Sequence, residues 1–459
     1  MTGKRFLKTV AIYGVGQIGN KVVDLVSFTI LVGALTQEQL GFVGTMMLLG
    51  FALTDLASIG LFRIAVPRFV LEKDQDRSAV LRNGLGGFCI YSFVVAFILS
   101  LCITGLLWFD GRNFVIPFTL YVASFWMRAL VYMELEVLRM EQRPVLQSLA
   151  EAVPSILNLL SLSLLMPASS DHLVTSGLSQ FIGSAVPFLG SFGAGIRRGS
   201  PAFSLLPALL RYSAPVVLHR SMAEVNQMGG RWIALVLFGL QGAGIYTFLS
   251  RVADILKMIL APIQKGWLPL LLRGAREEAH KKVGNLAVIY MTLACSGLIV
   301  FLLCHDLIAR MIDKSGAYRE YYEIIPWVAL GTWVTSYYMV FGVGFLVAKK
   351  TSQLVPLTTI AASINLIGGY FFAKWIGIPG IPIAAIVSSI FFVVSTLIFA
   401  RRYFRILYRP ARYVAIATLL AGGLGVFARI FAKEFWLWSY PGEVISEISG
   451  WAGVALLSQ

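Results

Sequence analysis

The sequence predicts an all-α polytopic membrane protein made of two six-helix bundles repeated in the same orientation, with one or two further spans at the C-terminus. Three observations predict this fold class. Of the 459 residues, 58% are hydrophobic and only 13% are charged, with a mean hydropathy of +0.78, whereas about a quarter of an ordinary soluble chain is charged. Apolar stretches of about 20 residues, long enough to cross a bilayer, recur along the chain. Short segments of the first half also return in the second half.

Twelve apolar stretches are expected to be membrane-spanning helices, because backbone groups in hydrocarbon must form their hydrogen bonds within their own segment. The first is too long for a cleaved signal peptide and is expected to be a retained span. The spans of the first half are expected near residues 9–35, 41–66, 81–109, 114–138, 145–166 and 173–195. Those of the second half are expected near residues 210–238, 243–268, 283–309, 321–347, 354–375 and 380–400.

The expected units are an N-terminal bundle (1–199), a C-terminal bundle (200–404) and a C-terminal extension (405–459). Within the extension, residues 412–432 resemble a thirteenth span. Residues 436–457 carry two glutamates and are either a short fourteenth span or an interfacial helix.

Basic residues set the expected orientation. The breaks on the side of the N-terminus hold 23 Lys and Arg, and those on the opposite side hold seven, so the positive-inside rule places the N-terminus in the cytoplasm. The net charge of +15 is then explained by cytoplasmic loops that face anionic lipid headgroups. We therefore expect the basic residues to contact membrane lipids, and we expect no binding of nucleic acid.

The repeat is visible at a nearly constant offset. Residues 40–43 (Leu-Gly-Phe-Val) return 203 positions later as residues 243–246 (Ala-Gly-Ile-Tyr), and Cys102 returns 202 positions later as Cys304. A fixed offset with small drift is the signature of an internal duplication. Because each half has an even number of spans, the halves point the same way, and such parallel repeats are typical of transporters with a site between the halves.

Motifs of enzymes are weak or missing. Gly14-x-Gly16-x-x-Gly19 has the spacing of a dinucleotide-binding loop, but it lies inside a span rather than after a strand, so we interpret it as close helix packing. The four cysteines lie in apolar stretches and the four histidines are far apart, so no metal site is predicted. The sequence has neither a P-loop nor a nucleophile elbow, and no catalytic residue or cofactor is expected.

Charged residues within the spans carry the functional prediction, because a charge at the centre of a span costs about 2.5 to 3.5 kcal/mol on insertion scales. Several share one helix face, and such faces are expected to line a common water-accessible cavity. The predicted cationic cavity residues are Lys21, Arg63, Arg128, Arg220, Arg231, Arg251 and Lys257. The candidate acids for coupling to an H⁺ or Na⁺ gradient are Asp24, Asp55, Glu151, Glu224 and Asp254.

The alternative is that these charges form structural ion pairs. Lys21 with Asp24, Arg220 with Glu224, and Arg251 with Asp254 have the spacing of helix neighbours.

Three arginines do not fit that alternative. Arg63, Arg128 and Arg231 have no acid three or four residues away, so they are expected to meet an external anion, and a guanidinium grips phosphate oxygens well. Asn158 and Asn365 are candidate sugar contacts, although such residues also join helices to one another.

The sequence resembles the MOP exporter superfamily and, within it, the Wzx-type flippases of lipid-linked oligosaccharides, over residues 1 to about 404. The resemblance rests on the paired segments Leu35-Thr-Gln-Glu-Gln-Leu-Gly41-Phe and Phe238-Gly-Leu-Gln-Gly-Ala-Gly244-Ile, on Met140-Glu-Gln-Arg143 before Asn158, on Lys349-Lys350 before Asn365, and on Gly377-Ile-Pro-Gly380. It implies two bundles that alternate between inward and outward openings, a cationic cavity for an undecaprenyl-pyrophosphate headgroup and its glycan, and the bacterial inner membrane.

The expected function is therefore the flipping of an undecaprenyl-pyrophosphate-linked oligosaccharide, such as an O-antigen precursor in lipopolysaccharide synthesis, with ion coupling. The expected state is a monomer, and a polysaccharide polymerase and chain-length machinery are the expected protein partners. The alternatives are a lipid II flippase, a MATE-like exporter and a membrane glycan polymerase or ligase. An exporter of cations would favour an acidic cavity, and a polymerase usually needs a large outer loop, whereas the loops here are short.

Overall fold

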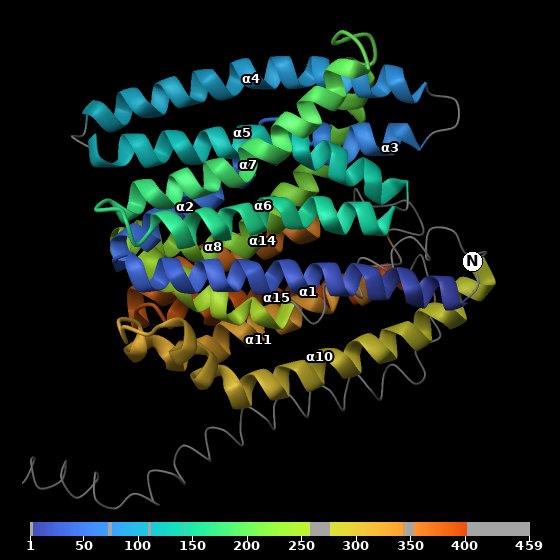
Figure 1. The fold of residues 1–459 in the computed structure, drawn as a ribbon. Helices are drawn as coiled ribbons and strands as arrows, with labels where there is room; N and C mark the ends of the chain where they lie inside the picture. Colours follow the sequence, from blue (N-terminus) through green and yellow to red (C-terminus); the bar gives the residue numbers. More distant parts are fainter. Residues whose placement is uncertain are drawn as a thin grey trace, which may run out of the picture.

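The computed structural model describes residues 3–71, 76–108, 112–141, 143–257, 276–342, 345 and 353–401. Within these residues the chain is helical and contains no strand. The long helices run side by side along one common direction (Figure 1). The predicted thirteenth span and the segment 436–457 lie outside the described residues.

The helices of the first half match the predicted spans closely, except for the second. Their bounds are α1 (Gly3–Ala34), α2 (Gln37–Phe51), α3 (Val66–Val70), α4 (Arg77–Trp108), α5 (Arg112–Met140), α6 (Pro144–Leu165) and α7 (His172–Arg197). Between α2 and α3 lie two π-helical turns, η1 (Ala52–Leu56) and η2 (Leu61–Ala65).

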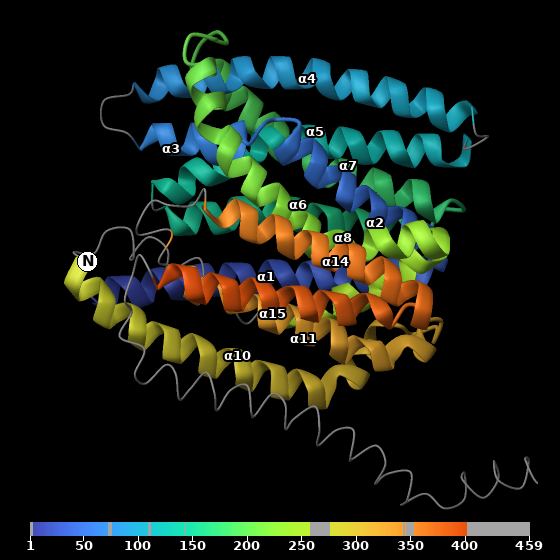
Figure 2. The same ribbon diagram turned by 180° about the vertical axis from the view of Figure 1, so that it is seen from behind.

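The second half is also helical. Its bounds are α8 (Leu206–Ala253), α10 (Arg276–Ile312), the 3₁₀ helix η3 (Arg319–Ile324), α11 (Ile325–Ser336), α12 (Tyr338–Phe341), α14 (Leu354–Ile376) and α15 (Gly380–Ala400). Figure 2 shows α14 and α15 side by side on the face opposite to the view of Figure 1.

Ten stretches of the described residues are long and apolar enough to span a membrane. They account for eleven predicted spans, because the stretch Leu206–Lys257 contains two of them, separated at Gly239 with its φ of 67°. The remaining predicted span, 321–347, is the succession of η3, α11 and α12. The all-α, multi-pass membrane fold predicted from the sequence is confirmed.

The prediction of one continuous second span over residues 41–66 is wrong. The α-helix ends at Phe51, and the backbone then passes through η1, a turn over residues 57–60, and η2 before α3 begins. At the turn, Ile59 and Gly60 have φ values of 49° and 65°, a left-handed conformation that cannot continue a right-handed helix. The break places Asp55 and Arg63 on two short elements that face each other.

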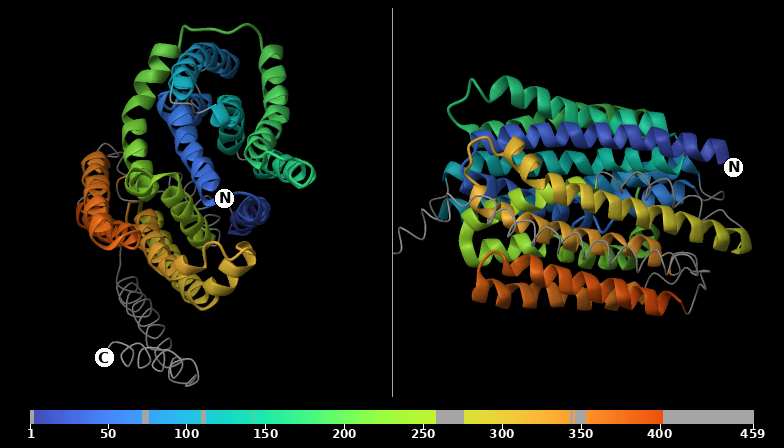
Figure 3. Two further views of the ribbon diagram at one scale, coloured as in Figure 1. Left: turned by 90° about the vertical axis from the view of Figure 1, so that its left-hand side faces the viewer. Right: turned by 90° about the horizontal axis from the view of Figure 1, so that it is seen from below.

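The two ends of the bundle differ in what they hold. We call the end where the N-terminus lies the near end, and it includes Glu141, Arg143 and residues 198–205; the opposite, far end includes 35–36, 166–171 and 313–324 (Figure 1). Viewed end-on, α4 to α7 lie on one side of the molecule and α10 to α15 on the other (Figure 3). Contacts of α1 with α6 and α10, and of α2 with α8, connect the two sides.

Local sequence signals fix the far-end turns. Thr36 caps α2, because its hydroxyl accepts a hydrogen bond from the main-chain amide of Gln39. The side chain of Gln39 in turn accepts a hydrogen bond from the main-chain amide of Thr36. This capping box satisfies two donors at the start of the helix. Asp171 caps α7 by accepting the amides of Leu173 and Val174. These caps start α2 and α7 at fixed points and so set the register of the side chains that α2 and α7 direct inward.

The outer faces are apolar and the polar residues point inward. On α4, Phe93, Phe97 and Leu101 are 78%, 65% and 58% exposed, which suits a face in contact with lipid. Among the described residues, the buried polar side chains instead lie between helices, and four of them, Ser27, Thr54, Ser176 and Arg231, line one cavity.

Candidate functional site

A cavity of about 620 Å³ lies among α1, α2, α5, α6, α7 and α8, within the usual size range of small-molecule sites. Its described lining is rich in charge, with five arginines and five acids, so it does not carry the excess of cations that the sequence suggested. The arginines are Arg63, Arg128, Arg220, Arg231 and Arg251, and the acids are Asp24, Glu136, Glu151, Glu224 and Asp254. Some of these arginines form ion pairs with carboxylates and others have only neutral partners, and this difference defines the site.

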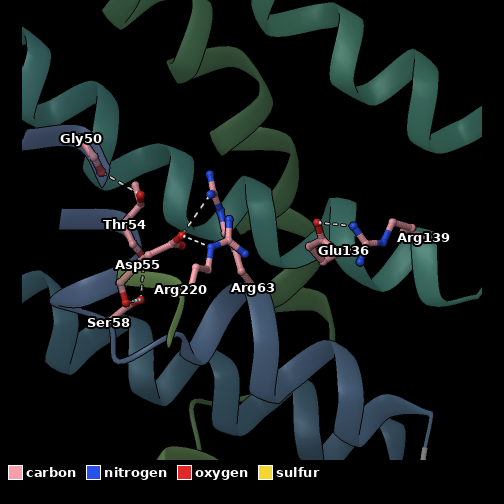
Figure 4. Close-up of polar contacts among 8 residues, drawn as sticks. All are labelled: Gly50, Thr54, Asp55, Ser58, Arg63, Glu136, Arg139 and Arg220. Atoms are coloured by element: carbon pink, nitrogen blue, oxygen red, sulfur yellow. Dashed lines mark hydrogen bonds and ion pairs between the residues drawn. The ribbon is translucent and has the colours of Figure 1, made fainter. Parts of the chain in front are cut away.

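Asp55 lies behind the cavity wall and holds two of the arginines. Its Oδ2 atom is 3.2 Å from Nη1 of Arg63 and 2.9 Å from Nε of Arg220 (Figure 4). The carboxylate is only 2% exposed, and the Arg63 and Arg220 side chains are 18% and 37% exposed. A buried carboxylate is tolerated when cations and hydrogen bonds compensate its charge, and the two guanidinium groups provide that compensation.

The alternative that Arg220 pairs with its helix neighbour Glu224 is therefore not found in the structure. Arg220 bonds to Asp55 on η1, not to Glu224 on its own helix. Likewise, Arg63 was expected to lack a carboxylate partner, but it bonds to Asp55 eight residues earlier in the chain. The helix break at residues 57–60 makes this contact, because it folds η2 back toward η1.

Arg63 has a second partner in Tyr132 of α5, whose ring lies 3.7 Å from the guanidinium carbon. A guanidinium stacked on an aromatic face gains a cation–π attraction that strengthens with burial. Glu136, one turn further along α5, pairs instead with Arg139 at 3.2 Å (Figure 4).

Arg128 has neutral partners. Its Nε donates to the Ser184 hydroxyl at 3.0 Å. With its amide oxygen turned toward Arg128, Gln180 accepts two further hydrogen bonds at 2.6 and 3.1 Å, an orientation assigned from the hydrogen-bond network. Both partners come from α7.

Arg231 and Arg251 also have neutral partners. Nε and Nη2 of Arg231 lie 3.2 and 2.9 Å from the Ser250 hydroxyl, and Nη2 of Arg251 lies 2.6 Å from the Met47 sulfur. In the part of the chain that the structure describes, neither these two arginines nor Arg128 forms an ion pair with a carboxylate. Among the described residues, three cavity arginines thus have only neutral hydrogen-bonding partners.

A smaller pocket of about 90 Å³ adjoins the cavity between α1 and α8, and it contains the two predicted lysines. Lys21 pairs with Asp24 at 3.5 Å, which confirms the spacing-based prediction. Lys257 pairs with Asp254 at 2.7 Å, so the predicted pair of Asp254 with Arg251 is wrong. Lys257 follows Asp254 by three residues in the same turn, and the two side chains are 46% and 34% exposed.

Two predicted acids form hydrogen bonds with side chains of α6. Asp24 accepts a hydrogen bond from Ser155 of α6 at 3.1 Å. Glu151 accepts from Gln147 at 2.8 Å on the same helix. Both acids line the cavity, as does Asn158.

Asn365, the other predicted sugar contact, is not brought to the cavity. It is 1% exposed in the interface of α14 with α8, where its amide nitrogen donates to the main-chain oxygen of Asn226 at 2.5 Å. Asn226 in turn accepts from Ser388 of α15 at 2.9 Å. Asn365 therefore joins helices to one another, which was the alternative to its predicted role as a sugar contact.

Sequence reasoning missed the contribution of α7. Ser176, Gln180 and Ser184 lie four residues apart on one face, and this face meets α5 through the bonds of Ser176 to Tyr121 and of Ser184 to Arg128. A polar stripe with helical spacing in an apolar span was the signal that could have identified them.

The arrangement of helices is similar to that of several solved structures. It is similar to an inward-facing multidrug resistance MATE family transporter of the MOP superfamily, with a TM-score of 0.68, 14% identity, and coverage of 83% of this chain and 94% of the other. It is also similar to the lipid II flippase MurJ in an inward closed conformation, with a TM-score of 0.69, 13% identity, and coverage of 93% and 99%. A MATE in the straight conformation gives a TM-score of 0.66 at 13% identity, covering 86% and 95%. At these identities the likeness defines the fold.

A comparison with curated protein sequences finds no match. Residues 6–275, more than half of the chain, match the family model described as polysaccharide biosynthesis protein. The chain therefore belongs to this family, and its described residues form a multi-pass arrangement of membrane-length helices.

Proposed function

We propose that the chain flips an undecaprenyl-pyrophosphate-linked oligosaccharide across the bacterial inner membrane by alternating access, and that it performs no covalent chemistry. The observation that carries this proposal is the set of three cavity arginines, Arg128, Arg231 and Arg251, whose bonded partners are neutral. An unpaired guanidinium in a membrane interior is costly. A pyrophosphate would supply the missing negative charge, and two of its oxygens could bind one guanidinium in a bidentate way.

Other features support the same cargo. The family is one of polysaccharide biosynthesis. The cavity volume of about 620 Å³ suits a headgroup with the first sugars of a glycan. Asn158, Ser155 and Tyr121 offer hydrogen-bonding groups at the same cavity, and the prenyl chain would stay in the surrounding lipid.

We place the near end in the cytoplasm, because the basic residues of the turns concentrate there. The far end would then face outward. It is closed by the crossing of α2 with α8 and by hydrogen bonds of Gln37 to Ala317 and Gln241. Release of the cargo requires this crossing to open.

A lipid II flippase is the second candidate, because the cargo has the same pyrophosphate chemistry and the fold is similar to that of MurJ. The two candidates differ in the glycan alone. Association with a polysaccharide polymerase or chain-length machinery, an O-antigen or lipopolysaccharide role, and a monomeric state stay predictions.

The test is a flipping assay in proteoliposomes that contain the full chain and a fluorescent prenyl-pyrophosphoryl oligosaccharide. Replacing Arg128, Arg231 or Arg251 singly by Gln should weaken headgroup binding about ten- to hundredfold, the value of one charge-assisted hydrogen bond set. Arg310→Gln is the matched control, because Arg310 is exposed at the far end of α10, outside the cavity. Normal flipping by all three cavity variants would refute the proposal.

Competition distinguishes the candidates. Unlabelled lipid II that competes no better than other pyrophosphate lipids supports the oligosaccharide cargo, and preferential competition by lipid II assigns the second candidate. Transport of an organic cation drug, with no flipping of either lipid, would assign a MATE-like exporter instead.

A further inference from the structure

A second pocket lies at the far end, in the second half of the chain. Its volume is about 460 Å³, and none of the described residues that line it also lines the cavity of about 620 Å³. Two segments form its walls: the succession of η3 and α11, and the turn 377–379 between α14 and α15 (Figure 2). We call it the far-end pocket. It is a separate site, and its walls and polar groups determine what it can bind.

The segment Gly377-Ile-Pro-Gly380, part of the sequence resemblance, forms one wall. Gly377 has a φ of 76°, a left-handed conformation that ends α14, and its main-chain oxygen accepts the amide of Gly380 at 3.0 Å. A Cβ atom on Gly380 would lie 2.3 Å from the main-chain carbonyl of Phe372, so α15 begins in direct contact with α14. This tight turn holds Ile378 and Pro379 at the pocket.

The other wall is anchored by Asp313. Its carboxylate accepts hydrogen bonds from the main-chain amide of Tyr318 at 2.8 Å and from the hydroxyl of Tyr322 at 3.1 Å. Tyr322 is buried and belongs to η3, so these bonds fix the backbone of η3 from its inner side. Both walls of the pocket are therefore held by contacts within the chain rather than by a ligand.

The polar groups of the far-end pocket are mostly acceptors. Its lining includes the exposed carboxylates of Glu320 and Glu323 and the hydroxyl of Tyr321, which hydrogen-bonds to Glu320. No lysine, arginine or histidine is among the described residues that line it. Carboxylates accept strong hydrogen bonds from hydroxyl donors and repel anions, so this pocket does not suit a phosphate headgroup.

The largest apolar group of the pocket is an indole. The side chain of Trp327 lines the pocket and is 42% exposed. Tryptophan is common at membrane interfaces, which accounts for Trp375 at the end of α14, 82% exposed and outside the pocket lining. That preference does not account for an indole that shares a pocket with two carboxylates and a phenol. The combination indicates a ligand with both an apolar face and hydroxyl donors.

A pyranose ring has both features. One face of the ring presents C–H groups that pack on an aromatic ring, and its hydroxyl groups donate to carboxylates. We infer that the far-end pocket is a binding subsite for a neutral saccharide, with Trp327 as the stacking platform and Glu320 and Glu323 as acceptors of sugar hydroxyl groups.

The place of this pocket in transport rests on the proposed function. With the far end facing outward, the pocket would bind sugar units of the glycan on the outer side, and such binding favours the outward position of the cargo over its return. An organic cation would use the same indole and carboxylates. Membership of a polysaccharide biosynthesis family favours the saccharide, and the experiment separates the two ligands.

The experiment is saturation-transfer difference NMR on the purified full chain, which detects weak binding through the ring protons of the ligand. The probe is an equimolar mixture of the methyl glycosides of glucose, galactose, mannose and N-acetylglucosamine, which carry no phosphate. The chain is kept in an acrylate amphipol, because alkyl-glycoside detergents would themselves occupy a saccharide site. The wild-type chain should transfer saturation to the sugar ring protons, with a dissociation constant on the order of 1 mM.

Trp327→Ala should weaken probe binding about tenfold, because it removes the aromatic face. Trp375→Ala is the matched control, since it removes an exposed far-end indole outside the pocket lining, and it should bind the probe as the wild-type chain does. Trp327→Phe keeps a smaller aromatic face and should weaken binding about threefold. This variant tests the platform if Trp327→Ala does not fold.

Substitution of the carboxylates separates a saccharide from a cation. The double variant Glu320→Gln/Glu323→Gln keeps a hydrogen-bond acceptor at each position and removes both negative charges. Saccharide binding should weaken by no more than about fivefold, and an excess of tetraethylammonium should leave the sugar signal of the wild-type chain unchanged. Displacement of the sugars by tetraethylammonium would assign a cation site and overturn the inference.

The outcomes also separate this inference from the proposed function. Absence of transfer from the wild-type chain, or equal transfer in the wild-type chain and Trp327→Ala, overturns the inference and leaves the proposed function standing, because the probes contain no pyrophosphate. Probe binding that depends on Trp327 supports it. If such a chain does not flip the lipid-linked oligosaccharide, the proposed function fails, and the pocket remains a saccharide site without a place in transport.

Discussion

Gly41 of α2 and Gly244 of α8 lie against each other's helices so closely that neither position has room for a side chain. A Cβ atom on Gly41 would lie 1.8 Å from the main-chain oxygen of Leu240, and one on Gly244 would lie 1.9 Å from that of Gln37. The relationship is reciprocal, because Leu240 precedes Gly244 by four positions and Gln37 precedes Gly41 by four positions. This crossing closes the far end by backbone-to-backbone contact, as small residues do between membrane helices.

We predict that Gly41→Ala or Gly244→Ala prevents the far end from closing as observed here. A methyl group at 1.8–1.9 Å from a main-chain oxygen forces the helices apart, because neither backbone can move aside independently of its helix. The expected result is a chain held open at the far end with reduced flipping. Cross-linking of cysteines placed at Gln37 and Gln241, which hydrogen-bond at 2.9 Å, measures the closure.

The matched control is Gly33→Ala on α1, where a new Cβ would meet no atom within 4 Å. Both substitutions raise helix propensity by a similar amount, so only the crossing distinguishes them. The four native cysteines are replaced beforehand. Equal cross-linking in the Gly41 and Gly33 variants would show that the crossing is not needed for closure.

The sequence indicated this region without revealing the contact. Residues 40–43 and 243–246 were identified as repeated segments, and the structure brings the repeated glycines together. Periodicity and hydropathy report which residues share a helix face, but they do not report which helices touch. The span count and the helix bounds were predictable because hydrocarbon thickness imposes them.

The site was predictable in its members and less so in its pairs. Charged residues in apolar spans are conspicuous because they are costly, and Arg128 and Arg231, which have no acid three or four residues away, form no ion pair within the described residues. The partner of Arg220 was predicted wrongly because spacing rules see only neighbours on one helix, whereas Asp55 is 165 positions away. The turn at Ile59 and Gly60, which brings Arg63 to Asp55, had no periodic signal.

Alkaline pH should loosen the far-end loop through Asp313. This carboxylate, 4% exposed, accepts the amide of Tyr318 at 2.8 Å and the hydroxyl of Tyr322 at 3.1 Å. Burial, and then the negative charge of Asp313, raise the pKa of Tyr318 and of Tyr322 above its usual value of 10. The unfolded loop therefore loses these protons first.

The stabilising contribution of the two tyrosines is fully present below pH 10 and is lost as pH rises through their folded pKa values. A spectroscopic titration of phenolate should show both tyrosines ionising late in the wild-type chain. In Asp313→Asn they should ionise earlier, although burial keeps them above the usual range. Tyr322→Phe removes one late-ionising group and serves as the assignment control; unchanged titration in Asp313→Asn would contradict the prediction.

Two adjacent residues at the break between η1 and η2 should respond oppositely to substitution. Ile59→Gly is expected to stabilise the chain by about 1 kcal/mol, because a glycine adopts the φ of 49° without the steric penalty of a β-branched residue. Gly60→Ala is expected to destabilise it by more, since its φ is 65° and a new Cβ would lie 2.3 Å from a methyl group of Val217. Thermal unfolding of the purified chain in detergent measures both. If Ile59→Gly lowers the midpoint as Gly60→Ala does, the Ile59 side chain contributes more through its contacts than its backbone conformation costs, and the break is held by packing.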